Sequence, residues 1–242
     1  PDQHLISVEL IRGCVHSHVK LCGLRDIADM TRTRIKICGI TNSRDAEFAV
    51  ACEADALGFN LYEDSPRYID VMAADKIIRQ LPPFVISVAL FVNHSDDEVH
   101  FALKKSSFDL LQFNGDETND YCRSFGKPFI KVFRVEAPWE LEERVNEFPH
   151  SRGVLLDAFV EGEYGGTGKT IDWKGIPAIN RPVVLAGGLN ADNVGLAIEQ
   201  VRPFAVDVSS GVESEKGIKD HGKIASFIRA VRAADSEANN EQ

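Results

Sequence analysis

Two groups that could exchange protons with a substrate stand at the ends of apolar runs in this 242-residue chain. Cys38 closes the run RIKIC, and Asp157 follows the apolar VLL in GVLLDAF. A thiolate can remove a proton from carbon while a carboxylic acid donates one to oxygen, which is general acid–base catalysis. Each residue also has a structural explanation, because a single cysteine is often a small buried hydrophobe and an aspartate after a strand often caps a turn.

A second Cys-Gly pair raises the question of which thiol is reactive. VKLCGL contains Cys22 and precedes the similar IKICGI, which contains Cys38, by sixteen residues. That spacing is too short for a duplicated strand–helix unit, and VKLCGL lacks the TNSRDA that follows Cys38. We therefore expect Cys38 alone to be functional. Cys22 belongs to an N-terminal extension, residues 1–29, which precedes the first methionine, Met30.

From Arg34 onward, eight apolar runs alternate with amphipathic, helix-like segments. The runs are RIKIC, DALGFNLY, VISVALFV, DLLQF, FIKVFRV, GVLLDAF, PVVLAGG and FAVDVSS. Strict alternation predicts parallel strands with crossover helices, and eight such units in roughly 200 residues make a closed (β/α)8 TIM barrel. No G-x-G-x-x-G follows the first run, which argues against an open dinucleotide-binding sheet. We expect one α/β barrel domain over residues 30–234 and a frayed polar tail over residues 235–242.

The composition of the chain excludes some classes of binding partner. The chain has 37 acidic against 27 basic residues and a net charge of -10, the wrong sign for non-specific binding to nucleic acid or anionic lipid. Its apolar stretches are shorter than the ~20 residues that a membrane span needs. Five cysteines without a CxxC pair favour a reducing cytoplasm. We expect a cytoplasmic monomer or homodimer that binds a small molecule, and neither nucleic acid nor a membrane.

In a barrel of this kind the active site lies at the carboxyl ends of the strands. Arg67 follows the second run in EDSPRYI and Asp207 lies in the last run, so both join Cys38 and Asp157 at that end. Arg67 could equally be a solvated loop charge. The glycine-rich turns YGGTGKT, AGGLN and SSGVE follow the last three runs and offer backbone N–H groups to an anion such as phosphate. One such turn would be ordinary, but three neighbouring ones indicate a phosphate site.

From Arg34 to Ala233 the chain resembles the phosphoribosylanthranilate isomerase family of tryptophan biosynthesis. The segments that carry the resemblance are KICGITNSRDA, SPRYI, GDE, LLDAF, GGTGKTIDW, LAGGLNADNV and DVSSGVESEKGIKD. The resemblance implies an isomerase of the aldose–ketose type. It implies the Amadori rearrangement of N-(5-phosphoribosyl)anthranilate to 1-(2-carboxyphenylamino)-1-deoxyribulose 5-phosphate, with neither a metal nor an organic cofactor.

The same resemblance implies a role for each candidate residue. Asp157 would be the general acid that opens the furanose ring, and Cys38 as thiolate would be the general base that removes the C2′ proton. Arg67 would bind the anthranilate carboxylate through its planar guanidinium. Asp207 would lie near the sugar or the amine. Backbone groups would hold the phosphate around Gly168, Gly187, Gly188, Ser210 and Gly211.

Two points stay open in the sequence. A free thiol has a pKa of about 8.5, so the site must stabilise the thiolate, and Lys36 can do so only if its side chain and that of Cys38 both point into the barrel. Asn114 stands where the family usually has His, which puts any contact of that His in doubt.

Other readings predict different residues. The related isomerase of histidine biosynthesis would have a carboxylate at position 38 and a second phosphate loop. An indole-glycerol phosphate synthase would have catalytic lysines and a longer N-terminal helical segment. A non-catalytic phosphosugar-binding barrel would lack the acid or the base.

Overall fold

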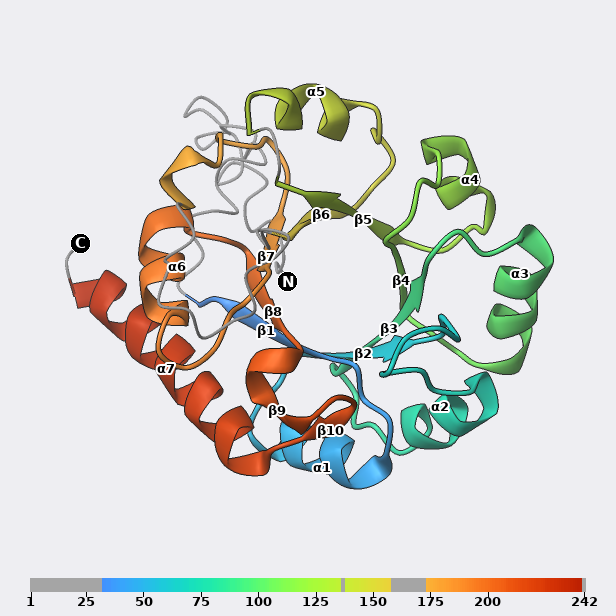
Figure 1. The fold of residues 1–242 in the computed structure, drawn as a ribbon, viewed down its shortest axis with the longest axis horizontal. Coiled ribbons are helices and arrows are strands. Elements are labelled where there is room, and N and C mark those ends of the chain that lie inside the picture. The colour runs from blue at the N-terminus through green and yellow to red at the C-terminus, as the bar shows by residue number, and fades with distance from the viewer. Residues whose placement is uncertain (1–31, 136–137, 158–172, 241–242) are drawn as a thin grey trace, which may run out of the picture.

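The computed structural model describes residues 32–135, 138–157 and 173–240, and in this part of the chain eight parallel strands close into a barrel (Figure 1). The barrel strands are β1 (Arg34–Cys38), β2 (Ala56–Asn60), β3 (Ile86–Phe91), β4 (Leu110–Phe113), β5 (Phe129–Arg134), β6 (Gly153–Asp157), β7 (Val183–Ala186) and β8 (Ala205–Val208). The α-helices are α1 (Ser43–Ala51), α2 (Val71–Ile78), α3 (Asp96–Lys105), α4 (Asn119–Ser124), α5 (Leu141–Asn146), α6 (Val194–Val201) and α7 (His221–Asn240). The predicted (β/α)8 barrel is confirmed, since β1 pairs with both β2 and β8.

The connections differ from the expected alternation at two places. The residues described between β6 and β7 contain the 3-10 turn η4 (Trp173–Gly175) and no α-helix. Between β8 and α7 the chain forms the 3-10 turn η5 (Ser210–Val212) and a small antiparallel hairpin of β9 (Glu213–Glu215) and β10 (Ile218–Lys219). Figure 1 shows this hairpin at the rim of the barrel, beside α1. The extension with Cys22 and the Gly168 turn lie outside the described residues.

Alternation along β1 separates its two sets of side chains. Ile35 and Ile37 are fully buried in the main core between strands and helices. Lys36 and Cys38 therefore point to the other side of the strand, which is the barrel interior. This resolves the open question about β1, because the amine and the thiol share the inner face.

Several helices begin at side chains that satisfy free backbone N–H groups. The Asn42 side chain accepts from Asp45 N at the start of α1, and Asp70 accepts from Met72 N and Ala73 N at the start of α2. A 3-10 turn, η3 (Pro138–Glu140), leads into α5. Within the described ranges, no helix is long and apolar enough to cross a membrane.

The helix α7 continues to Asn240, so the expected frayed tail at residues 235–242 is wrong for residues 235–240. The reason is a contact between two residues that are 202 positions apart in the sequence. Thr33 donates its backbone N–H to both carboxylate oxygens of Asp235, at 3.0 Å each, and its hydroxyl at 2.6 Å. Asp235 thereby fastens the end of the chain to the residue that precedes β1.

We expect Asp235→Ala to lower the free energy of unfolding by about 1–3 kcal/mol, because the part-buried N–H and hydroxyl of Thr33 lose a charged acceptor. Chemical denaturation of both proteins measures the difference. Glu237→Ala, an exposed carboxylate on the same helix, is the matched control and should change stability by less than about 0.5 kcal/mol. Equal effects of the two substitutions would contradict this role of Asp235.

Candidate active site

The sulfur of Cys38 and the amine of Lys36 meet in a gap on the inner wall of the barrel, opposite Gly58 on β2. Cys38 pairs with Gly58 in the strand register. A Cβ atom built on Gly58 would lie 2.9 Å from Cys38 Sγ and 3.0 Å from Lys36 Nζ. The missing side chain at Gly58 therefore provides the space in which the thiol and the amine approach one another.

Two lysines oppose the effect of burial on the thiol. Cys38 is 7% exposed, and burial raises its pKa above that of a free thiol. The charge of Lys36 lowers the pKa, the charge of Asp207 raises it, and the charge of Lys219 lowers it again. The net direction is upward, so Cys38 is mainly a neutral thiol in the free protein.

Asp207 lies beside Lys36 and not in open contact with solvent. The two residues are paired in the register of β8 and β1, and Lys36 Nζ donates to Asp207 Oδ1 at 2.9 Å, with both side chains less than 10% exposed. Burial acts to lower the pKa of Lys36, but the charges of Asp207 and Cys38 and the hydrogen bonds to both outweigh it and raise the pKa. Asp207 thus keeps a cation beside the thiol.

Arg67 reaches the site from the loop between β2 and α2, where it forms a two-point ion pair. Its Nε and Nη2 donate to the two carboxylate oxygens of Glu213, each at 2.7 Å. Glu213 also accepts from Lys219 Nζ at 2.9 Å, and the Lys219 side chain is fully buried. Residues 146 positions apart therefore converge on one charge cluster, made of Arg67, Glu213 and Lys219.

Burial and the hydrogen bonds within this cluster shift the pKa values of its three members. Burial acts to raise the pKa of Glu213, but hydrogen bonds from Arg67 and Lys219 lower it below the usual value. Burial lowers the pKa of Lys219 despite the opposing effect of Glu213. The hydrogen bond to Glu213 raises the already high pKa of Arg67. Glu213 is therefore a carboxylate at neutral pH.

Asp157 ends β6 and is half-buried. It is two residues from Leu155, which belongs to the small hydrophobic cluster formed by Ile130, Val132, Leu155 and Ala186. Because residues two apart on a strand share a face, Asp157 lies on the inner face at the mouth of the barrel. Cys38 and Asp157 thus end strands from well-separated parts of the ring (Figure 1).

The turns after β7 and β8 pack against one another. Gly187 and Gly188 have φ values of 92° and 64°, a conformation that favours glycine. A Cβ on Gly211 would collide with the carbonyl oxygen of Leu189, so Gly211 is needed for this close approach. Ser210 is exposed beside it, at the start of η5. Four of the five predicted phosphate-binding residues therefore lie on two adjoining turns.

Asn114 lies just beyond β4, at the exposed rim, where its Oδ1 accepts from Gln112 Nε2 at 3.0 Å. The other amide atom, Gln112 Oε1, is buried and has no hydrogen-bond partner among the residues that the structure describes. Where the family usually has His, this chain therefore has Asn114, which hydrogen-bonds to the inward-facing Gln112 of β4.

Sequence reasoning missed Glu213 and Lys219 as members of the site. Both lie inside the segment DVSSGVESEKGIKD, which carries part of the family resemblance. The sequence did hold a signal for Glu213. It lies two residues beyond Gly211, in the segment that leads from β8 into the barrel mouth. The sequence did not indicate the hairpin that turns Lys219 back toward Glu213.

Comparisons with known proteins identify the family and the fold. The family model of N-(5'-phosphoribosyl)anthranilate (PRA) isomerase matches residues 35–230. The N-(5'-phosphoribosyl)anthranilate isomerase of Dechloromonas aromatica is 52% identical over 206 residues, which cover 84% of this chain and 98% of that one.

Two solved structures agree as well. Phosphoribosylanthranilate isomerase of Thermotoga maritima is 41% identical with a TM-score of 0.75, over 83% of this chain and 99% of that one. Monomers generated from the dimeric enzyme of the same organism are 37% identical with a TM-score of 0.71, with the same coverage. This chain belongs to the phosphoribosylanthranilate isomerase family.

Proposed function

We propose that this chain converts N-(5-phosphoribosyl)anthranilate to 1-(2-carboxyphenylamino)-1-deoxyribulose 5-phosphate, with Asp157 as the general acid and Cys38 as the general base. Asp157 gives its proton to the furanose ring oxygen, the C1′–O bond breaks, and a protonated Schiff base forms. Cys38 then removes the C2′ proton, and the electron pair neutralises the imine nitrogen to give an enolamine. Tautomerisation of the enolamine yields the ketone product.

The observation that carries this proposal is the meeting of Cys38 and Lys36 beside Gly58. An ammonium group beside a buried thiol lowers the electrostatic cost of removing the thiol proton, because the thiolate that forms lies next to a cation. Lys36 remains bound to Asp207 at 2.9 Å, so its position does not depend on the charge of the sulfur. This arrangement is suited to a base that must form and disappear in each cycle.

The rest of the substrate fits the other parts of the mouth. The Arg67 guanidinium would bind the anthranilate carboxylate, and the turns with Gly187, Gly188, Ser210 and Gly211 would hold the phosphate. Gly168, which we expect to complete the phosphate site, is outside the described residues. Asp207 would act through Lys36 in the free protein, since its carboxylate is already paired.

The direct test is a steady-state assay of the purified chain with freshly generated phosphoribosylanthranilate. We expect turnover of this substrate and none of the larger substrate of the histidine-pathway isomerase, because Cys38 replaces the carboxylate which that enzyme has after its first strand. A protein that binds the product but never turns over the substrate would support the non-catalytic phosphosugar-binding barrel instead.

We further infer that the enzyme acts on this free small molecule in the cytoplasm, without nucleic acid or a membrane. The net charge of -10 opposes non-specific binding to polyanions. Among the described cysteines, Cys38, Cys52 and Cys122 are unpaired thiols, as expected in a reducing compartment.

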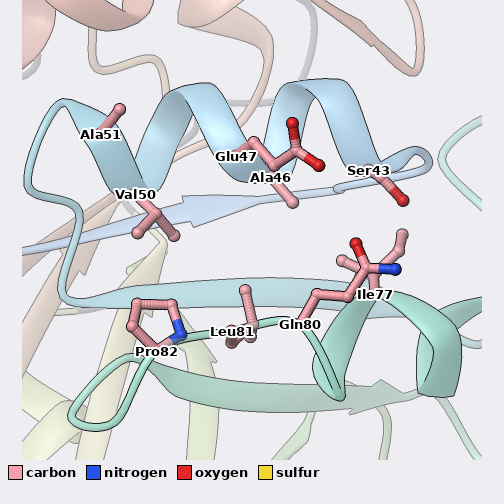
Figure 2. A pocket seen from close by; sticks show the side chains of 9 residues that line it. All are labelled: Ser43, Ala46, Glu47, Val50, Ala51, Ile77, Gln80, Leu81 and Pro82. Atoms are coloured by element: carbon pink, nitrogen blue, oxygen red, sulfur yellow. The ribbon is translucent and has the colours of Figure 1, made fainter.

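For the assembly we propose a homodimer formed by the loop between α2 and β3, residues 79–85. Phe84 in this loop is 97% exposed and has a φ of 74°, which is strained for a phenylalanine. The same loop lines an apolar pocket of about 230 Å³ between α1 and α2, where Val50 lies opposite Leu81 and Pro82 (Figure 2). A loop with both a projecting ring and a pocket wall suits a two-fold contact between copies, and the Thermotoga maritima relative is dimeric.

Phe84→Asp should convert the homodimer to a monomer, because it places a charge in the apolar contact. Sedimentation velocity at matched concentrations measures the mass of each protein. Phe101→Asp, which replaces an exposed phenylalanine of α3, should sediment as the wild type does. A wild-type monomer, or a dimer that survives Phe84→Asp, would overturn this assembly.

A further inference from the structure

Arg67 offers a substrate only one of its two hydrogen-bonding edges. A guanidinium group can bind carboxylates side-on through Nε and Nη2, or end-on through its two terminal nitrogens. Glu213 takes the side-on edge, with both distances at 2.7 Å. The Arg67 side chain is 23% exposed and that of Glu213 only 5%. The carboxylate of Glu213 is therefore enclosed, whereas Arg67 extends from it toward solvent.

The position of Glu213 is itself fixed from several sides. Lys219 Nζ binds Glu213 Oε1 at 2.9 Å and also donates to Ser209 O at 3.1 Å. Lys223 Nζ donates to the backbone carbonyl of Glu213 at 2.7 Å. The side-chain carboxylate and the backbone carbonyl of Glu213 are thus each bound by a lysine. These contacts give the carboxylate one preferred orientation.

The hairpin that carries Glu213 is fastened to two other loops of the barrel mouth. Lys219 N donates to Asp45 Oδ2 at 3.1 Å, and Thr41 Oγ1 donates to Gly217 O at 2.7 Å. A Cβ atom on Gly217 would lie 2.6 Å from the carbonyl oxygen of Pro66, so the hairpin touches the loop of Arg67 through its backbone as well. The loops after β1, β2 and β8 are therefore in direct contact with one another through the hairpin.

We propose that Glu213 is a positioning residue, which holds Arg67 so that the terminal nitrogens of its guanidinium face the carboxylate of the substrate. This inference rests on the proposed function. Lys219 has a second part in it, because Arg67 paired with Glu213 alone would carry no net charge. With Lys219 the cluster has two cations and one anion, and the surplus positive charge attracts the incoming carboxylate.

The test compares Glu213→Gln with the wild type on two substrates. The glutamine keeps the shape, but its amide nitrogen is a donor that faces a donor of Arg67, so the guanidinium turns away. With phosphoribosylanthranilate we expect KM to rise roughly tenfold or more and kcat to stay within about twofold. With N-(5-phosphoribosyl)aniline, which lacks the carboxylate, kcat/KM should equal that of the wild type.

Two further variants make the outcome decisive. Glu117→Gln disturbs another buried ion pair, with Lys131 at 3.0 Å, and controls for destabilisation. It should lower thermal stability as Glu213→Gln does and leave KM unchanged. Arg67→Lys should raise KM for the anthranilate substrate and leave kcat/KM for the aniline analogue unchanged.

Each remaining result refutes part of the argument. If Arg67→Lys shows this selectivity and Glu213→Gln penalises both substrates equally or neither, the positioning role is wrong. If Arg67→Lys is itself unselective in an active enzyme, the proposed role of Arg67 fails and the inference fails with it. An inactive wild type refutes the proposed function.

Discussion

Cys38→Ser is expected to lower kcat by about 10³-fold, within the range of about 10²–10⁴-fold that a general base typically contributes. The hydroxyl is smaller than the thiol and does not ionise near neutral pH, so no anionic base forms beside Lys36. Steady-state kinetics with phosphoribosylanthranilate measures the loss. Cys52→Ser is the matched control, because this cysteine lies just after α1 and outside the site, and it should keep wild-type turnover. Alkylation or deletion of Cys22 should likewise leave activity intact.

The pH dependence of the wild type follows from the same thiol. Burial raises the pKa of Cys38 above its ordinary value in the free protein. A base whose pKa is raised is protonated at neutral pH and becomes active as the pH increases, so kcat/KM should climb from neutral into alkaline solution. Cys38→Ser should lose this rise. A wild-type profile that is flat between neutral and alkaline pH would contradict Cys38 as the titrating base.

Asp157→Asn is expected to lower kcat by about 10²–10⁴-fold, because an amide cannot give a proton to the ring oxygen. The residue keeps its place at the end of β6, so KM should change much less than kcat. Product formation in single-turnover experiments separates loss of chemistry from loss of binding. Asp120→Asn, an exposed carboxylate on α4, is the control and should be silent. Near-normal turnover by Asp157→Asn would remove Asp157 from the mechanism.

Local patterns in the sequence were enough to predict the strands and to place the candidate residues at their carboxyl ends. Each predicted run contains one barrel strand, because strands buried on both sides are mostly apolar. The positions of Cys38 and Asp157 followed directly, since both are the last residue of a strand. The direction of Lys36 required only the burial of its neighbours Ile35 and Ile37.

What the sequence did not predict depends on pairs that are distant along the chain. Lys36 and Asp207 are 171 positions apart, and Arg67 and Glu213 are 146 positions apart. Such pairs are set by barrel closure and by the path of the β9–β10 hairpin, and no local spacing encodes them. The prediction for the end of α7 was wrong for the same reason. A polar segment at the end of a chain predicts a frayed tail unless its contact with Thr33 is known.

The space beside Gly58 also constrains how this enzyme can change over generations. A methyl group there would occupy the volume that Cys38 Sγ and Lys36 Nζ now share. A larger residue at position 58 would displace the thiol or the amine, and a bulkier base at position 38 would need the same space. We therefore expect residues 38 and 58, on neighbouring strands, to change together and not singly.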